Sequence, residues 1–365
     1  MVNDKINVGV LFGGKSAEHE ISLRSAKNVI EALDKTRFNP VLIGITQEGK
    51  WMYSDQSPIL VQKENSDDYI INPKSQHVAM TPQSGGTLSA LEEKITLNKI
   101  DVVFPILHGP FGEDGTIQGL LKLANVPFVG AGVLGSAVGM DKDIMKRLLI
   151  EAGLNIGDYL TIRAHENRPS FETIEKKLGM PCFVKPANLG SSVGITKVES
   201  KEFYEEALDE AFSFDRKIVI ESLIEGREIE CAVLGNEYPK ASVPGEITFS
   251  HSFYSYEAKY QDDKGYKIEI PAVLNEEQIK KVQEVAIKTF QTLECEGFGR
   301  IDVFLTKEDR IVVNEINTIP GFTKISMYPK LWEASGLSYS KLISNLIDLA
   351  LDRFEKEKSI RSSID

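Results

Sequence analysis

The chain has few cysteines and histidines and no excess of positive charge. Its three cysteines, Cys182, Cys231 and Cys295, form no Cys-x-x-Cys pair, and only five histidines accompany them. This usage predicts neither a disulfide framework nor a zinc site, and it is typical of a reducing cytoplasm. The net charge of −12 argues against a broad electrostatic grip on nucleic acid or on an anionic membrane.

Long hydrophobic runs are also missing. No apolar stretch approaches the length needed to span a bilayer, and the first residues lack the apolar core of a signal peptide. We therefore expect a cytoplasmic protein with neither a membrane nor a nucleic acid as partner. At 365 residues the chain is long enough for two or three domains.

Residues 1–130 have the pattern of an α/β unit. An apolar run at 6–12 ends at two glycines, and apolar residues then recur at helical spacing. Further strand-like runs follow, and the polar stretch of about 47–95 is expected to be an irregular insertion. The pattern predicts a Rossmann-like parallel sheet; the further runs are 40–46 and 101–107.

The rest of the chain reads as α+β in two parts, 131–221 and 222–365. Asp141 is a good N-cap for a helix, in which the apolar residues Ile144 and Leu148 stand four apart. Strand-like runs follow, and helices close the chain. No internal repeat or low-complexity segment interrupts this pattern.

Two strand-like runs between residues 300 and 317 flank a charged turn and place acids among apolar residues. Because side chains alternate along a strand, Arg300 and Asp302 share one face of the first run. Glu315 and Asn317 likewise share one face of the second. Carboxylates thus meet across a predicted hairpin, and such oxygen atoms are the ligands that Mg²⁺ prefers. The alternative is a sheet with one solvated face.

Residues 185–194, Lys-Pro-Ala-Asn-Leu-Gly-Ser-Ser-Val-Gly, predict a flap over phosphates. The segment lies between two strand-like runs, and its glycines and the small Ser191 and Ser192 let backbone N–H groups approach a polyanion. Lys185 can supply the charge. Lys142, at the start of a helix, is a second candidate cation. A plain hairpin turn explains the glycines but not a lysine in an apolar strand.

A second phosphate-binding string, G-x-x-x-x-G-K-[ST], occurs at 9–16. Its central residues continue an apolar strand, so they cannot form a loop of exposed amides. The two glycines fit better as a turn at a sheet edge, where ligands of open α/β sheets bind. Glu18 then either holds a substrate ammonium or complements the positive start of a helix.

Acids also follow the apolar strand that ends near Glu221. Such a segment can form a hinge between two lobes. Backbone groups from Glu221 to Leu223 can then bind an adenine edge, and Glu228 can accept from ribose hydroxyls. An ordinary strand followed by a charged turn explains the pattern equally well.

Six blocks spread along the chain stand in one family's order: Gly-Gly-Lys-Ser-Ala-Glu-His-Glu-Ile-Ser (13–22), His-Gly-Pro-Phe-Gly-Glu-Asp-Gly (108–115), 185–194, Tyr-Glu-Ala-Lys-Tyr (256–260), Gly-Arg-Ile-Asp (299–302) and Asn-Glu-Ile-Asn-Thr-Ile-Pro-Gly (314–321). Together they closely resemble the D-alanine:D-alanine ligases of the ATP-grasp superfamily. The resemblance implies a three-domain ATP-grasp architecture, with ATP between the second and third domains and two D-alanines at the junction with the first. ATP would phosphorylate one D-alanine, and the amine of the other would attack the acyl phosphate, in peptidoglycan precursor synthesis.

The resemblance also implies which residues hold ATP and two Mg²⁺ ions, or Mn²⁺ in their place. Each residue stands at a position that matches a family motif. The metal ligands are Asp302, Glu315 and Asn317, the phosphate contacts are Lys142, Lys185, Ser192 and Lys259, and the adenosine contacts are Glu221, Leu223 and Glu228.

Substrate and catalytic roles are implied in the same way. Removing one hydrogen-bond donor to the oxyanion of a tetrahedral intermediate typically raises the activation free energy by about 2.7 to 4 kcal/mol. Glu18 would bind the first ammonium, Ser191 and Tyr260 would link the covering loops to Glu18, His108 would lie near the reacting groups, Arg300 and the Gly321 N–H would stabilise the oxyanion, and Ser326 with Met327 would bind the second substrate.

Tyr260, in an omega-type loop of about 250–270, bears on specificity. Relatives that use D-lactate carry Phe or His there, so Tyr favours an amine nucleophile. Ser222 departs from the family pattern, in which many members have Lys beside the adenine. The family further implies a homodimer, the commonest oligomer symmetry.

Two other classes of function are alternatives to a ligase. A P-loop nucleotidase would need Lys15, whereas a non-catalytic amino-acid sensor would bind D-alanine without releasing phosphate. We predict that Lys15→Ala changes ATP affinity little and that Lys185→Ala weakens it severely, because only Lys185 precedes a phosphate flap. Equilibrium binding of a labelled ATP analogue measures both affinities, and the reverse order would favour the nucleotidase.

Overall fold

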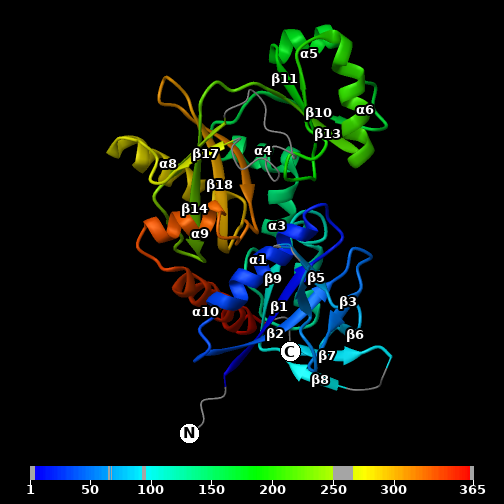
Figure 1. Ribbon diagram of the computed structural model, residues 1–365. Coiled ribbons are helices and arrows are strands. Elements are labelled where there is room, and N and C mark those ends of the chain that lie inside the picture. The colour runs from blue at the N-terminus through cyan, green and yellow to red at the C-terminus, as the bar shows by residue number, and fades with distance from the viewer. Residues whose placement is uncertain (1–4, 65, 67, 93–95, 250–265, 362–365) are drawn as a thin grey trace.

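The computed structural model describes residues 5–64, 66, 68–92, 96–249 and 266–361. Its strands form three main sheets that follow one another along the chain, with helices packed on each (Figure 1). Within these ranges, none of the helices combines the length and apolar composition that a membrane crossing requires.

The first sheet is built around β1 (Ile6–Gly13), which pairs in parallel with β2 (Phe38–Ile45) and β9 (Val102–Ile106). The C-terminal part of β1 is buried on both sides, as expected for a strand inside a parallel sheet. The predicted parallel pairing is therefore confirmed for these three strands, and the apolar residues of the 9–16 string are core. Two helices accompany these strands, α1 (His19–Ala32) and α2 (Thr116–Leu123).

The stretch after β2 differs from the expected irregular insertion. It contains short strands, most of which extend the first sheet to the order β8-β7-β6-β3-β2-β1-β9, while β4 and β5 form a separate ribbon. Strands of three to five residues are too short to leave a clear alternation in a polar sequence. They are β3 (Trp51–Tyr53), β4 (Leu60–Gln62), β5 (Tyr69–Ile71), β6 (Gln76–Met80), β7 (Thr87–Ala90) and β8 (Thr96–Lys99).

The second sheet is antiparallel, with the order β10-β13-β11-β12. Two helices and a short 3₁₀ turn cover it, and they bury Ile174, Leu208 and Ala211 against its strands. The predicted flap connects β11 to β12. The elements are β10 (Tyr159–Arg163), α5 (Phe171–Leu178), β11 (Cys182–Pro186), β12 (Thr196–Val198), η1 (Lys201–Phe203), α6 (Tyr204–Phe214) and β13 (Lys217–Ser222).

The third sheet has the order β17-β16-β14-β18-β19, and β15 pairs with β14. Helix α8 packs on β14, β15, β18 and β19, and α9 packs on β14. The elements are β14 (Arg227–Gly235), β15 (Lys240–Ala241), β16 (Gly245–Phe249), β17 (Tyr266–Glu269), α8 (Glu276–Thr292), β18 (Gly297–Leu305), β19 (Ile311–Asn317), α9 (Met327–Ala334) and α10 (Tyr339–Lys358).

Helices α3 (Val133–Met140) and α4 (Lys142–Glu151) connect the first sheet to the second. Asp141 caps α4 as predicted, because its carboxylate accepts from two backbone N–H groups of the first turn. The buried apolar face of α4 is Met145 and Leu149, which join the core of the third sheet. Leu148, which the four-residue spacing favoured for that face, is exposed.

An aromatic cluster joins the first and third sheets. Phe322 lies with its ring centroid 5.9 Å from that of Phe104 in β9, 5.7 Å from that of Phe298 in β18 and 5.7 Å from that of Tyr328 in α9. Edge-to-face rings at these separations add to the burial of large apolar surfaces. The two sheets therefore share one hydrophobic core.

Candidate functional site

A cavity of about 910 Å³ is lined by residues from all three sheets and their connections. Every site residue predicted from the sequence that the structure describes lines this cavity, from Glu18 in the first part of the chain to Met327 in the last. Lys259 and Tyr260 lie outside the described residues. Residues separated by more than 300 positions in the chain thus meet at one site.

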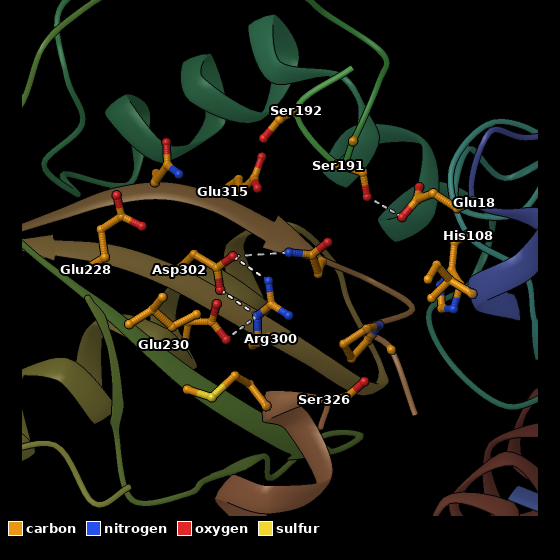
Figure 2. A pocket seen from close by; sticks show the side chains of 18 of the residues that line it. Glu18, His108, Ser191, Ser192, Glu228, Glu230, Arg300, Asp302, Glu315 and Ser326 are labelled. Atoms are coloured by element: carbon orange, nitrogen blue, oxygen red, sulfur yellow. Dashed lines mark hydrogen bonds and ion pairs between the residues drawn. The ribbon is translucent and has the colours of Figure 1, made fainter. Parts of the chain in front are cut away.

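The acid hairpin has the predicted register. Asp302 of β18 pairs with Glu315 of β19, and Arg300 pairs with Asn317, with an irregularity just after Asp302. The predicted meeting of the two carboxylates across the hairpin is therefore confirmed. Figure 2 shows their side chains on the cavity side of the sheet.

Arg300 is held between two carboxylates (Figure 2). Its Nε and Nη2 donate to the two oxygens of Asp302 at 2.8 and 2.7 Å, and its Nε lies 2.8 Å from Oε2 of Glu230 in β14. Burial alone would lower the pKa of Arg300, but the charges of Asp302 and Glu230 outweigh burial and raise it. The guanidinium is thus a permanent, oriented positive charge at the cavity wall.

The oxygen atoms near Arg300 fit a divalent cation. Asp302, Glu315 and the side-chain amide of Asn317 are hard oxygen donors on adjacent strands. Asn317 Nδ2 donates to Asp302 at 3.2 Å, and the Nζ of Lys142 lies 3.7 Å from Oε2 of Glu315. Among the described residues, no group of three acidic, histidine or cysteine side chains is placed to bind a metal. The oxygen atoms that this part of the cavity offers a cation are therefore those of two carboxylates and one amide.

Two lysines share one buried acid behind the flap. The carboxylate of Glu221 accepts from Lys185 Nζ at 2.7 Å and lies 3.3 Å from the Nζ of Lys146. Burial opposes the charge on Glu221, but the two lysines outweigh it and lower the pKa of Glu221 to about 2. Burial lowers the pKa of Lys146, which is 2% exposed. Glu221 therefore holds Lys185 in place at the base of the flap.

The flap contacts the other side of the cavity. The hydroxyl of Ser191 donates to Glu18, which stands at the start of α1 (Figure 2). Ser191 and Ser192 both have positive φ, 52° and 60°, which turns the flap backbone sharply. Lys142 Nζ donates to the Leu189 carbonyl at 2.5 Å. The flap is thus held to the first and second parts of the chain at once.

His108 is a buried histidine that lines the cavity together with Glu18. Its Nδ1 lies 2.9 Å from the carbonyl oxygen of Ile319, which can only accept, so Nδ1 carries the proton. Within the described residues, its Nε2 has no hydrogen-bond partner. Burial lowers the pKa of His108. His108, with an unprotonated Nε2, therefore lines the same cavity as Glu18.

Ser326 stands at the start of α9, beyond the hairpin. Its Oγ accepts from the Thr323 N–H at 3.0 Å and lies 2.7 Å from the Thr323 hydroxyl. A Cβ added at Gly321 would lie 2.8 Å from Ser326 Oγ, so a larger residue there would have to displace this hydroxyl. The backbone between the hairpin and α9 is therefore packed against this hydroxyl.

Sequence reasoning missed two of these charged residues. Glu230 follows the predicted Glu228 by two positions, so strand alternation could have placed it on the same face. Lys146 follows Lys142 by four positions on α4, which is one helical turn. Neither residue stands in one of the six family blocks.

Two models of known protein families match this chain. The family model described as D-ala D-ala ligase N-terminus matches residues 7–131, and the model described as D-ala D-ala ligase C-terminus matches residues 148–348. The chain belongs to the D-alanine–D-alanine ligase family. The resemblance to this family, inferred from six short blocks of sequence, is therefore confirmed.

Curated members of the family are similar along nearly the whole chain. The D-alanine–D-alanine ligase of Shouchella clausii is 53% identical over 99% of this chain and 98% of its own length. D-alanine–D-alanine ligase A of Escherichia coli K12 is 50% identical over 99% of this chain and 100% of its own length. The chain is thus an enzyme of this ligase family.

Solved structures of the family have the same fold. The D-alanine-D-alanine ligase from Coxiella burnetii has a TM-score of 0.83 and 36% identity, and the match covers 98% of this chain and 97% of that one. The VanG D-Ala:D-Ser ligase from Enterococcus faecalis has a TM-score of 0.82 and 35% identity, covering 95% and 100%. The predicted ATP-grasp architecture is confirmed by these ligases.

We predict that the buried acid shared by Lys146 and Lys185 stabilises the fold. Glu221→Gln leaves two lysines without their acid, so the free energy of unfolding should fall by about 3–5 kcal/mol. The contribution of Glu221 is present above its ordinary pKa of 4.5 and is lost as the pH falls towards about 2. The stability of the variant should therefore depend less on pH over that window. Urea titrations at several pH values measure both effects.

Glu225→Gln is the matched control. Glu225 follows Glu221 by four positions in the chain. It forms an exposed ion pair with Lys307 at 3.7 Å. Removing it should change the free energy of unfolding by less than about 1 kcal/mol. Equal losses in the two variants would contradict the role given to Glu221.

Proposed function

We propose that this chain joins two D-alanine molecules into D-alanyl-D-alanine, with ATP converted to ADP and phosphate, for peptidoglycan precursor synthesis. The observation that carries the proposal is the cavity in which an acid hairpin, the flap lysine Lys185, Lys142 of α4 and Glu18 face one another. Positive charge for a polyphosphate and oxygen ligands for its metal ions line one wall. An acid for an amino group lies on the opposite wall.

ATP would lie between the second and third sheets. Lys142 and Lys185 supply point charges for the phosphates, and backbone N–H groups of the flap beside Ser192 supply donors. Glu221, Leu223 and Glu228, at the passage from β13 to β14, would contact the adenosine. Leu223 is an exposed apolar residue of the cavity lining, as a base-contacting residue needs to be.

Asp302, Glu315 and Asn317 would hold two Mg²⁺ ions, and Mn²⁺ would serve in their place. Divalent ions bound there neutralise charge on the phosphates during transfer. Arg300 already occupies both oxygens of Asp302. That contact keeps the carboxylate aimed and compensates its charge before the nucleotide arrives.

The first D-alanine would be held by its ammonium at Glu18, beside His108. Its carboxylate oxygen attacks the terminal phosphorus of ATP, and the bond to ADP breaks. The resulting D-alanyl phosphate is an activated acyl group. The hydroxyl of Ser191 donates to Glu18 and would orient its carboxylate towards the ammonium.

The second D-alanine would be held through its carboxylate by Ser326, with Met327 packing beside it. Its amine attacks the acyl carbon, and Arg300 and the Gly321 N–H stabilise the tetrahedral oxyanion. In the described part of the chain, the Gly321 N–H has no hydrogen-bond acceptor. The intermediate then collapses to dipeptide as phosphate leaves, and the departing phosphate takes the proton that the attacking nitrogen gives up. Lys259 would contact phosphate, and Tyr260 would complete the link to Glu18.

Three further features belong to the proposal. The chain would divide into domains at 1–130, 131–221 and 222–365, each built around one sheet. Two copies would form a homodimer. The enzyme would act in the cytoplasm, where its substrates and ATP meet.

A product assay tests the reaction. The protein is incubated with ATP, Mg²⁺ and D-alanine, with L-alanine, D-lactate or D-serine offered in parallel, and the products are identified by mass. We expect phosphate release coupled to D-alanyl-D-alanine, made from the D enantiomer alone. Phosphate release without dipeptide, or a preferred ester or D-serine product, would refute the assignment of the second substrate.

Glu315→Gln tests the metal ligands. Turnover should fall by about two orders of magnitude or more, because metal-assisted charge stabilisation is worth several kcal/mol. Mn²⁺ affinity, measured by calorimetry with an ATP analogue present, should fall as well, while thermal unfolding stays near that of the parent. Glu308→Gln, in the exposed turn of the same hairpin, is the control. Near-normal metal affinity in Glu315→Gln would remove Glu315 from the site.

A further inference from the structure

The segment from Ile319 to Phe322 connects the acid hairpin to the helix that carries Ser326. It contains Gly321, whose N–H is the proposed oxyanion donor. Although this segment belongs to the third part of the chain, residues of the first part hold it at both ends. Its position is therefore set from across the cavity.

Both backbone polar groups of Ile319 are held by the 108–115 block. The Ile319 N–H donates to Glu113 Oε1 at 2.9 Å, and the Ile319 carbonyl accepts from His108 Nδ1 at 2.9 Å. The second oxygen of Glu113 accepts from the Gly109 N–H at 2.8 Å. Glu113 therefore bridges the backbone that carries His108 to the backbone that carries Gly321.

Glu113 suits such a bridge because it is rigid and uncharged. Its side chain is buried, with 9% of the residue exposed. Burial and the nearby charge of Glu18 raise the pKa of Glu113 to about 8, so the group is mostly protonated at neutral pH. A neutral acceptor adds no repulsion against the carboxylates of Glu18 and Glu315.

The other end of the segment is held by α1. The Phe322 N–H donates to Ser25 Oγ at 3.2 Å, and the Phe322 carbonyl accepts from Asn28 Nδ2 at 3.2 Å and from the Tyr339 hydroxyl at 2.8 Å. Pro320 has no N–H to donate. The Gly321 N–H is thus the backbone donor left between two tethered peptides.

We propose that Glu113 is a positioning residue, which holds the Ile319 peptide so that the Gly321 N–H points at the oxyanion of the tetrahedral intermediate. Ser25 supports the same segment from its far end. This inference rests on the proposed ligase reaction and assigns it a residue that does not touch the substrate. Misplacing a catalytic donor by about 1 Å can cost about 100-fold in rate.

Glu113→Gln is the direct test. Gln keeps the size and neutral charge, but it replaces one acceptor oxygen by an NH₂ group that faces a backbone N–H. We expect kcat for dipeptide synthesis to fall about 10- to 100-fold, with the KM for ATP unchanged. Ser25→Ala loosens the Phe322 end, and we expect a smaller fall of the same kind.

A tetrahedral analogue separates positioning from general damage. In a phosphinate analogue of the dipeptide, a P–O⁻ group stands where the oxyanion forms, so its affinity reports the donor directly. Its affinity should fall in Glu113→Gln by about the same factor as kcat. The affinity for D-alanine alone should stay within about twofold.

Gln118→Met is the matched control. Gln118 is also buried and donates to the same block, to the Gly112 carbonyl at 2.8 Å, but it does not touch Ile319. Its loss should lower thermal stability without a selective loss of phosphinate affinity. The same pattern in Glu113→Gln and Gln118→Met would reduce Glu113 to a structural residue and overturn the inference.

Failure of this inference can be distinguished from failure of the proposed function. If the parent enzyme forms no dipeptide, the ligase proposal itself fails. If the parent is active and Glu113→Gln does not fold, Ser25→Ala decides. Unchanged kcat and phosphinate affinity in that variant would overturn the positioning of Gly321 by this segment.

Discussion

The structure depends on balancing the negative charges gathered around one partly buried cavity. Asp302 and Glu230 share Arg300, and Glu221 shares Lys146 and Lys185. A buried carboxylate without a cation costs several kcal/mol. Glu230 and Glu221 meet their cations on other elements, whereas Asp302 meets Arg300 on its own strand. Charge balance therefore depends on the pairing of strands within the second and third sheets and on the packing of α4.

The first part of the chain completes a site whose nucleotide end is built by the other two. It supplies Glu18 to the flap through Ser191, and it holds the backbone of Ile319 and Phe322 through Glu113 and Ser25. The shared aromatic core around Phe322 anchors the same junction. A ligase that must exclude water from an acyl phosphate gains from this arrangement, because the donors and the covering flap are fixed by common contacts.

Features of the fold and the site were predictable from the sequence where a rule over a few neighbouring residues was sufficient. Strand alternation and the charged turn were enough to place Asp302 opposite Glu315, and Asp141 was recognisable as a helix cap. The rule failed on α4, where spacing favoured Leu148 for the core and the structure exposes it. Met145 and Leu149 of that helix pack in the core of the third sheet, and Lys146 reaches Glu221, contacts that periodicity cannot show. The short strands of the 47–95 region were missed because they form only by pairing with an existing sheet edge.

The sequence by itself determined the family, the strands that carry the acids and the glycine-rich flap, because these depend on residue type and spacing over a few positions. Only the tertiary structure decided that Glu113 holds Ile319 and that Lys146 shares Glu221 with Lys185. Their partners lie 36 to 206 positions away, as the separations of Lys185 from Glu221 and of Glu113 from Ile319 show. No local propensity encodes such distances, and the free energy of burying a charge selects the partner only once the chain has folded.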